Sequence, residues 1–385
     1  MVVKTRGITN KEKKKRRHRK RKQRKDAKFK RLELSDDILR IILSKLSFVD
    51  CTRLRIVCKR WKKLIEEEIS TPVGILPWQM IFRWQPAGAS QVKSICKLYD
   101  PSDSKTYTVE HGIKGEERKK FVNARPCFSK YGWVFFAKLT DDGENHICFV
   151  YSPFANEVID LPELKGGYHF RPAFSSSPAS TDCLFFCFCS KTYGGGWINI
   201  CRQGDQAWTR VVEAYGVEAG IIGGIDSVVY LNGIFFCLFN CKRFGGFNAI
   251  KQEWFFLDNH CSALVVMPLH LIGFATMAES DGQLFMMFVD FGMPEWCIVR
   301  FDFSQNMFIK EEGLGNRALF SSNSNASLIP AVGDTSELAD TINWPGLPPY
   351  SYKNGKSLQC CKAYSKVPPL GKSRKIWIGT PRWNS

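Results

Sequence analysis

The segment from Leu32 to Ile65 reads LELSDDILRIILSKLSFVDCTRLRIVCKRWKKLI, and it predicts a compact helical unit. Ser35, Asp36 and Asp37 are typical of a helix start. The Ser35 hydroxyl can accept a backbone N–H, and the two carboxylates oppose the positive end of the helix dipole. Apolar residues then recur at helical spacing, which predicts one buried stripe made of Ile38, Ile41, Ile42 and Leu46.

A second apolar stripe is expected on a helix that begins near Asp50. Its members are Leu54, Val57, Cys58, Trp61, Leu64 and Ile65. The opposite face is basic and carries Arg53, Arg55, Lys59, Arg60, Lys62 and Lys63. Two short helices bury little surface by themselves, so this unit needs a partner. The partner is either the chain's own domain, as in an ordinary helical hairpin, or another protein.

The residues of this unit favour another protein as the partner. The segment resembles the F-box, a short helical motif that docks onto a Skp-type adaptor in cullin-based ubiquitin ligases. The matching residues are Leu34, Asp36, Ile38, Leu39, Ile42, Leu46, Leu54, Arg55, Val57, Cys58, Lys59, Arg60 and Trp61. The chain departs from the family at Ser35, where that family usually has proline, and at Ser47, where it often has proline again.

The resemblance implies a set of residues for adaptor binding. These residues divide between the core of the F-box and the adaptor contact: Leu34, Ser35, Ile38, Leu39, Ile42, Leu46, Leu54, Val57, Cys58 and Trp61. Apolar side chains at helical spacing suit a mode of binding in which a helix fills a partner's hydrophobic groove.

Positive charge is concentrated in residues 1–31. The whole chain carries a formal charge of +18, and 17 of its Lys and Arg residues lie between Lys4 and Arg31. We expect a disordered tail, because so polar a segment cannot bury a core. Its centre predicts a nuclear localisation signal made of Lys13, Lys14, Lys15, Arg16, Arg17, Arg19, Lys20, Arg21 and Lys22. Nuclear or nucleolar localisation and an importin partner are therefore expected, with the cytoplasm as the alternative.

Cysteine and histidine indicate neither disulfides nor a metal site. The 15 cysteines lie mostly inside apolar runs, as in Cys183–Cys189, without a signal peptide or a CxxC pair. Such residues behave as small buried hydrophobes in a reducing compartment. The six histidines are scattered, so no metal or cofactor is expected. The most apolar stretch, Cys261–Ala278, is interrupted by Pro268 and Gly273, and it predicts two strands rather than a membrane span.

From Trp78 onward short apolar runs alternate with turn signals such as Asn232-Gly233 and Asp281-Gly282. Four aromatic anchors are 50 residues apart, at Phe135, Phe185, Phe235 and Phe285. A second strand-like run follows each anchor, at His146–Tyr151, Gly196–Cys201, Gln252–Leu257 and Trp296–Phe303. A repeat of about 50 residues with several strands indicates a β-propeller of about six blades. A β-sandwich with strands that are Phe-rich by chance is the alternative.

Residues 71–385 also resemble the C-terminal part of plant F-box proteins that was long called domain of unknown function 295. Matching stretches include CKLYDPSDSKTYTV, VYSPFANEVIDLPEL, DSVVYLNGIFF, ESDGQLFMMF and KIWIGTPRW. This family is taken to be a β-propeller, with residues 321–372 as a degenerate last repeat. Recurring double glycines rank a kelch propeller second, because the Tyr and Trp of that repeat do not follow at fixed distances.

The expected chain is therefore an α+β multidomain protein. A basic tail (1–31) precedes a helical F-box (32–70) and an all-β propeller-like domain (71–385). Sequence motifs of hydrolases, zinc proteases and nucleotide-binding loops are absent, which predicts a non-catalytic protein. The substrate-binding residues are unknown, and the candidate connections are Lys191–Gly196, Cys241–Phe247 and Phe291–Trp296.

Two functions remain open at the level of sequence. The first is a substrate-recognition subunit of an SCF-type (Skp–cullin–F-box) E3 ubiquitin ligase. Its F-box would dock the Skp-type adaptor, and through it cullin, while its propeller binds a protein substrate. The second is a nuclear or nucleolar polyanion-binding protein that uses the basic tail, with nucleic acid as a partner. Neither function involves a membrane.

Overall fold

The computed structural model describes residues 34–43, 46, 48–55, 57–68, 76–84, 94–101, 104–109, 120–166, 169–190, 196–214, 225–239, 244–257, 272–290, 296–322, 325–343, 350–351 and 374–379. The chain divides into two units, Met1–Ser70 and Thr71–Ser385. The residues of the basic tail, including those from Lys13 to Lys22, lie outside the described residues.

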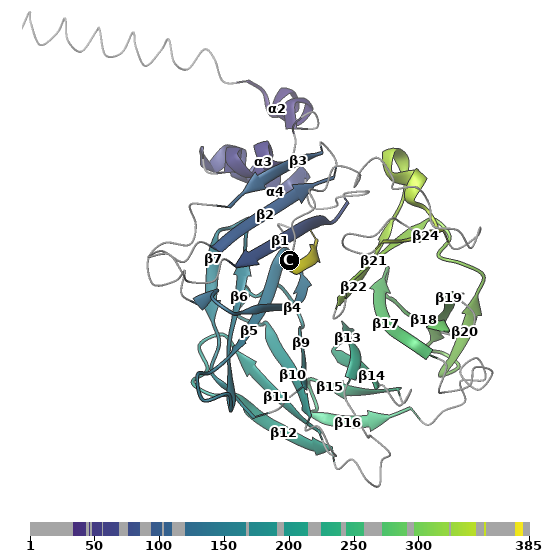
Figure 1. The fold of residues 1–385 in the computed structure, drawn as a ribbon. Coiled ribbons are helices and arrows are strands. Elements are labelled where there is room, and N and C mark those ends of the chain that lie inside the picture. Colours follow the sequence, from purple (N-terminus) through teal and green to yellow (C-terminus); the bar gives the residue numbers. More distant parts are fainter. Residues whose placement is uncertain are drawn as a thin grey trace, which may run out of the picture. The chain divides into compact units, whose positions relative to one another are not determined.

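The first unit contains three described helices, α2 (Asp36–Leu43), α3 (Phe48–Arg55) and α4 (Lys59–Glu68) (Figure 1). The expectation of one continuous helix from Asp50 to Ile65 is wrong. Val57 and Cys58 lie between α3 and α4, and both residues are exposed. The Val57 N–H donates to Leu54 O at 3.0 Å, a bond across three residues that closes the end of α3 as a turn.

The second unit is a ring of six sheets, called blades 1–6 here (Figure 1). Blades 1–5 are antiparallel, and blade 6 is mixed. The strands of blades 2 and 3 are β4 (Arg125–Lys130), β5 (Trp133–Leu139), β6 (Asn145–Ser152), β7 (Glu157–Asp160) and the short β8 (Leu164–Lys165), then β9 (His169–Phe174), β10 (Leu184–Ser190), β11 (Gly196–Arg202) and β12 (Thr209–Ala214). In these two blades the first strand along the chain lies at the inside of the ring, because β4 contacts β9 of the next blade.

Blades 4 and 5 repeat this order. Their strands are β13 (Ile225–Leu231), β14 (Ile234–Phe239), β15 (Phe244–Asn248) and β16 (Glu253–Phe256), then β17 (Ile272–Ser280), β18 (Gln283–Asp290), β19 (Trp296–Asp302) and β20 (Met307–Glu311). The turns between first and second strands use residues with positive φ, as at Asn232 (50°) and Gly233 (84°). This conformation is the one that two-residue hairpins require, so the Asn-Gly turn signal is confirmed.

Blade 1 combines the two ends of the second unit. It contains β25 (Arg374–Ile378), β1 (Trp78–Trp84), β2 (Ser94–Asp100) and β3 (Lys105–Thr108), in that order from the inside of the ring. Strand β25 contacts both β4 of blade 2 and β21 of blade 6, so it closes the ring. The C-terminal run Lys375-Ile376-Trp377 is thus the innermost strand of the first blade.

Blade 6 departs from the common strand order. Its strands are β21 (Arg317–Ser322), β22 (Asn325–Pro330), β23 (Thr341–Asn343) and β24 (Tyr350–Ser351), ordered β22-β21-β23-β24. The chain therefore enters at the second position, turns back to the inner one, and reaches the third through the 3-10 helix η3 (Gly333–Leu338). As a result β21 and β23 are parallel. The sheet begins at Arg317, within the regular part of the sequence and ahead of the segment 321–372 that was expected to be degenerate.

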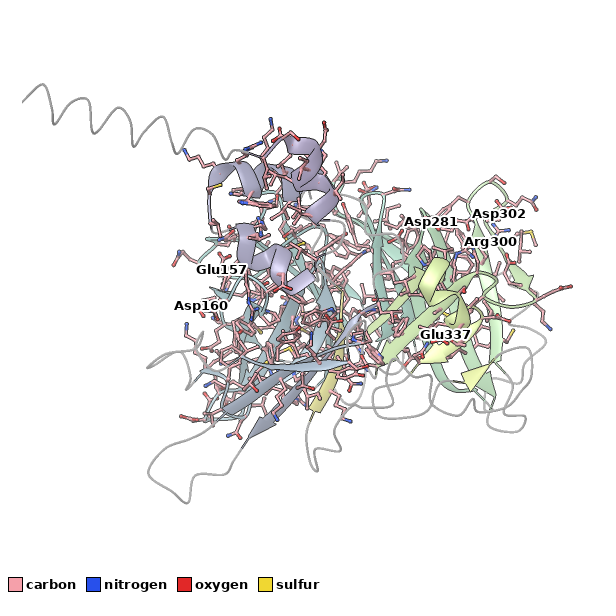
Figure 2. The ribbon with its side chains drawn as sticks, turned by 90° about the horizontal axis from the view of Figure 1, so that it is seen from above. Glu157, Asp160, Asp281, Arg300, Asp302 and Glu337 are labelled. Carbon is pink, nitrogen blue, oxygen red and sulfur yellow. The ribbon has the colours of Figure 1, made fainter. Side chains whose placement is uncertain are left out.

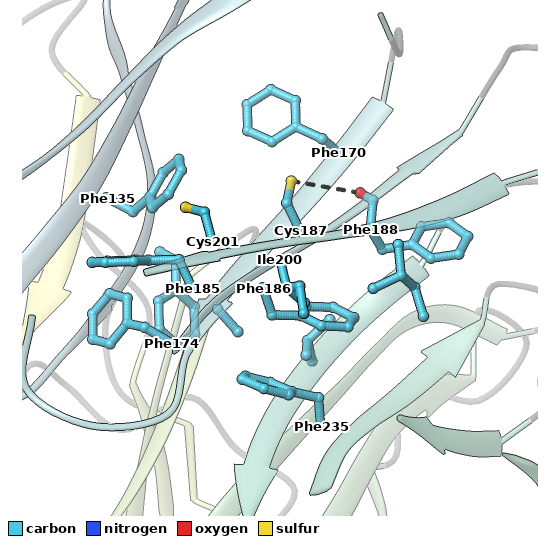
Figure 3. Packing of buried hydrophobic residues seen from close by; sticks show 14 of the residues in the cluster. Phe135, Phe170, Phe174, Phe185, Phe186, Cys187, Phe188, Ile200, Cys201 and Phe235 are labelled. Atoms are coloured by element: carbon cyan, nitrogen blue, oxygen red, sulfur yellow. Dashed lines mark hydrogen bonds between the residues drawn. The ribbon is translucent and has the colours of Figure 1, made fainter. Parts of the chain in front are cut away.

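The four Phe anchors occupy equivalent places, which confirms the repeat of 50 residues. Phe135, Phe185, Phe235 and Phe285 lie on the second strand of blades 2, 3, 4 and 5, and all four are buried. Neighbouring blades pack through such rings (Figure 3). For example, Phe186 of blade 3 stacks on Phe235 of blade 4 with centroids 4.6 Å apart.

Cysteines fill gaps between these rings. Cys187 and Cys201 lie among the phenylalanines in Figure 3, and both are buried free thiols. Burial also raises the pKa of the Cys96 thiol to about 12, which keeps it protonated. These described cysteines act as small apolar side chains, in agreement with their placement inside hydrophobic runs of the sequence.

Part of the expected connection Cys241–Phe247 is instead the strand β15 in blade 4, so that expectation is wrong for residues 244–247. A Cβ on Gly246 would lie 2.5 Å from Cζ of Phe255 and 2.8 Å from Cγ2 of Ile234. Gly246 therefore makes room for side chains of adjacent strands, and Gly245 makes room for the backbone oxygen of Phe255, which would lie 2.7 Å from a Cβ there. The run Gln252–Leu257 contains the fourth strand of this blade. The repeat in the sequence had aligned it with runs that form the third strand in the other blades.

Candidate functional site

The start of helix α2 is capped as the sequence predicts. Ser35 Oγ accepts the N–H of Ile38 at 3.5 Å, and Ser35 O accepts the N–H of Leu39 at 3.1 Å. Asp36 and Asp37 lie in the first turn. The cap fixes where the helix begins, and therefore which side chains of α2 share a face.

Helix α2 has one buried face and one exposed apolar face. Leu39 and Leu43 are buried, whereas Leu34, Ile38 and Ile41 are 43%, 46% and 63% exposed. Ile38 and Ile41 are three positions apart on one side of the helix, and Leu34 lies just before its first residue. We call these three residues the apolar stripe. Exposed apolar side chains gathered on one helix face indicate a binding surface, since single exposed ones are common but contiguous ones are not.

Helices α2 and α4 contact each other. Their buried apolar residues are Leu39 and Leu43 on α2 and Leu64 and Ile65 on α4. Trp61 is partly buried. The expectation that Ile38 and Ile41 form part of the buried stripe is therefore wrong. The buried residues of α2, Leu39 and Leu43, each follow by one position a residue of the expected stripe.

Two ion pairs join α2 to α4. Arg40 Nη2 lies 2.6 Å from Glu67 Oε2. Arg60 donates to Asp36 Oδ1 through Nε at 2.8 Å and through Nη2 at 2.6 Å, and Nη2 also donates to the backbone carbonyl of Leu34 at 2.5 Å. Both pairs are partly exposed, so each stabilises the fold by only about 0–1 kcal/mol.

The segment between α3 and α4 adds a further apolar side chain to this unit. Val57 is 64% exposed, and Cys58 beside it is exposed as well. The basic face of the sequence is also present, because Arg53, Lys59, Lys62 and Lys63 are all exposed. This unit therefore presents apolar side chains for a hydrophobic contact next to positive charges that attract an acidic partner.

The residues expected from the sequence fall into three groups. Leu34, Ser35, Ile38, Val57 and Cys58 are exposed, Leu39 is buried, and Ile42, Leu46, Leu54 and Trp61 are partly buried. Sequence reasoning missed Ile41 and Arg60 as members of the site. The signal for Ile41 was its spacing of seven residues from Leu34, but a helix stripe of this kind is usually core.

The propeller carries no comparable site among the residues that the structure describes. The candidate connections between Lys191 and Gly196, between Phe291 and Trp296, and from Cys241 to Arg243 lie largely outside them. Each of the three joins the second strand of a blade to the third, in blades 3, 4 and 5. Because neighbouring strands of these blades are antiparallel, β10, β14 and β18 all finish at the same end of their blades.

Several charged side chains of the propeller pair with a residue of their own blade or of the segment next to it. Arg300 Nε donates to Glu311 Oε1 at 2.7 Å, and Lys120 Nζ to Asp160 Oδ2 at 2.6 Å. Figure 2 labels one partner of each pair, Arg300 and Asp160. The hydroxyl of Ser304 hydrogen-bonds to the carboxylate of Asp302 and lowers its pKa. Within the described ranges, His, Cys, Asp and Glu form no group of three or more that could hold a metal ion. In the same ranges no helix has the length and hydropathy to cross a membrane.

Comparison with known proteins identifies both units. The KIB1-4 beta-propeller family matches residues 98–338, more than half of the chain, and the F-box domain matches residues 32–71. This protein belongs to the KIB1-4 beta-propeller family. It carries an F-box domain ahead of its propeller, and that architecture is typical of non-catalytic substrate receptors.

Relatives of this family member occur in Arabidopsis thaliana. The F-box protein At3g56470 is 24% identical over 296 residues, which cover 76% of this chain and 72% of the relative. The F-box/kelch-repeat protein At1g57790 is 29% identical over 231 residues, or 59% of this chain and 58% of the relative. The F-box/kelch-repeat protein KIB1 is 36% identical over 159 residues, or 41% of this chain and 38% of the relative.

Proposed function

We propose that this protein is the substrate-recognition subunit of an SCF-type E3 ubiquitin ligase. Its F-box docks a Skp-type adaptor, which links it to cullin, and its propeller binds a protein substrate. The observation that carries the proposal is the apolar stripe of Leu34, Ile38 and Ile41, which is exposed while the other side of α2 is buried. A receptor of this kind needs no active site, because it acts by bringing the substrate close to the enzyme that other subunits supply.

Adaptor binding is tested with the full chain and a purified Skp-type adaptor. The variant Ile38→Asp/Ile41→Asp places two charges in the apolar stripe, and Ile250→Asp is its matched control. Ile250 is 86% exposed in the turn after β15, far from the F-box in sequence. We expect the double variant to bind at least about thirtyfold more weakly, as for a hot spot of about 2 kcal/mol, and the control to bind like the wild type. Undiminished binding of the double variant, or no binding of the wild type, would exclude this function.

We also propose that the basic tail directs this receptor to the nucleus through an importin. The 17 basic residues between Lys4 and Arg31 support this proposal. Replacing Lys13–Lys15, Arg16, Arg17 and Arg19–Lys22 with Gln in a fluorescent fusion should move the protein to the cytoplasm. Adaptor affinity should stay unchanged, since it depends on the F-box. Nuclear accumulation of the Gln variant equal to that of the wild type would contradict the proposal.

Polyanion binding by the tail gives a different result in the same set of proteins. Affinity for a nucleic acid would fall steeply with salt, because each neutralised phosphate releases counterions. Between about 50 and 200 mM salt, a protein that makes several phosphate contacts loses about 10³-fold in affinity for nucleic acid. The affinity for the adaptor, which depends on apolar side chains, should change little over the same range.

A further inference from the structure

The backbone before helix α2 is held by a side chain from another helix. Arg60 of α4 bonds to the carboxylate of Asp36 and to the carbonyl of Leu34. We propose that Arg60 is a positioning residue for adaptor binding, which fixes Leu34 relative to α2 so that the apolar stripe is presented as one ordered surface. This proposal rests on the adaptor-binding function proposed above.

Leu34 needs such a support because it lies outside the helix. The first bond of α2 that runs between backbone groups starts at Ser35 O, and the N–H of Ile38 is taken by the Ser35 hydroxyl. Arg60 Nη2, at 2.5 Å from Leu34 O, ties this carbonyl to α4. Leu34 is nevertheless one of the exposed members of the apolar stripe.

The planar shape of guanidinium suits this role. Arg60 directs Nε and Nη2 at one carboxylate oxygen of Asp36 and uses Nη2 again for Leu34 O. A lysine in the same place keeps the charge but is a compact point donor on a flexible chain. Arg60→Lys therefore removes the fixed geometry and retains the attraction to Asp36.

The effect should appear in binding and not in folding. Half-exposed ion pairs add little to stability. A segment that is already ordered, however, loses less conformational freedom when it binds, and this gain appears as affinity. Fixing the backbone of one residue corresponds to roughly a tenfold change in an equilibrium constant.

The ion pair of Arg40 and Glu67 provides a matched control. It also joins α2 to α4, has the same distance of 2.6 Å as the pair of Arg60 Nη2 and Asp36, and is similarly exposed. In contrast to the bond of Arg60 with Leu34 O, the contact of Arg40 with Glu67 joins two side chains. We therefore expect Arg60→Lys to bind a purified Skp-type adaptor about tenfold more weakly than the wild type in titration calorimetry, and Arg40→Lys to stay within about twofold.

A second measurement does not depend on the adaptor. In the free full chain, hydrogen exchange of the amides from residues 34–39 should be faster in Arg60→Lys than in the wild type or Arg40→Lys, while the thermal midpoints of the three proteins agree. Unchanged exchange in Arg60→Lys would overturn the positioning role.

A double-mutant cycle with Leu34→Ala separates positioning from direct contact. If Arg60 acts through Leu34, Arg60→Lys causes little further loss once Leu34 is alanine. Additive losses would mean that Arg60 contacts the adaptor itself, which overturns the proposal but leaves the function intact. Equal affinity of the wild type and Arg60→Lys for the adaptor would also overturn the positioning role and leave the proposed function intact. If the wild type does not bind the adaptor, both the positioning role and the proposed function are overturned.

Discussion

Lys130 Nζ lies 3.8 Å from Glu279 Oε2, and the two residues belong to blades on opposite sides of the ring. Lys130 ends the inner strand of blade 2, and Glu279 is near the end of the inner strand of blade 5. Two other blades separate them in either direction around the ring. The pair therefore links two blades that share no hydrogen-bonded strand.

Replacing either partner should lower the stability of the propeller slightly. We expect Lys130→Met and Glu279→Gln each to reduce the free energy of unfolding by up to about 1 kcal/mol, because both side chains remain partly exposed. Urea unfolding of the two single variants and the double variant gives the coupling. A coupling of zero at low salt would show that the two charges do not interact across the ring.

The hydrogen bonds of Asn325 should contribute more. Its amide donates to Ser129 O at 2.8 Å and to Ser129 Oγ at 3.0 Å, which joins blade 6 to blade 2. Both residues are buried, so Asn325→Ala leaves a carbonyl without this donor and should cost about 1–3 kcal/mol. Gln203→Ala in an exposed turn is the control. Equal urea midpoints for Asn325→Ala and the wild type would contradict the expectation.

Trp377 is expected to be essential for closing the ring. Its Nε1 donates to Ser321 O of blade 6 at 3.1 Å, its carbonyl accepts the hydroxyl of Ser129, and its ring meets Phe320 edge-on. Trp377→Ala should destabilise the propeller by about 3–5 kcal/mol and expose it to limited proteolysis. Lys375→Ala on the same strand should change the proteolysis rate little, and comparable rates for the two variants would argue against this role of Trp377.

Asp226 should make stability depend on pH. Burial raises its pKa to about 6, although Arg171 on the next inner strand acts in the opposite sense. Because the folded protein holds this proton more tightly than the unfolded chain, the contribution to stability is complete below about pH 4 and is lost as the pH rises through 6.

The variant Asp226→Asn removes this titration. It should be more stable than the wild type at pH 7.5 by roughly 1–3 kcal/mol, and the difference should disappear near pH 4. Unfolding free energies at the two pH values provide the measurement. A difference of the same size at both values would attribute the effect to a cause other than ionisation.

The two faces of α2 should respond differently to truncation. Leu39→Ala removes a buried side chain and should destabilise the F-box by about 2–5 kcal/mol, whereas Ile41→Ala removes an exposed one and should leave its stability nearly unchanged. Hydrogen exchange of the amides of residues 36–43 in the full chain reports the difference. Equal protection of these amides in the two variants would contradict the assignment of a buried and an exposed face.

Much of the propeller was predictable from Phe135, Phe185, Phe235 and Phe285. Their separation of 50 residues is regular because each blade repeats the same short strands and turns around a ring. The closing strand at Trp377 and the inverted order of blade 6 were not predictable. Both depend on which distant strands pair, and a pattern of alternating residues carries no information about the pairing of strands.

The F-box shows the same limit at a smaller scale. The cap at Ser35 followed from local chemistry, and the structure agrees. Local chemistry did not decide whether Ile38 or Leu39 is buried, because the two residues are equally apolar and adjacent in the sequence. Only the position of α4 decides which side of α2 is covered, and Arg60 joined the site for the same reason.

The origin of blade 1 from both ends of the propeller bears on how the protein is synthesised. Strand β1 ends at Trp84, but its inner neighbour begins at Arg374, so roughly 290 residues must be translated between them. At usual elongation rates this takes about 15–60 s. During that interval the F-box is already outside the ribosome while blade 1 of the propeller has an unpaired strand edge. Nascent chains should therefore need chaperones to shield this edge until β25 has been synthesised and pairs with β1.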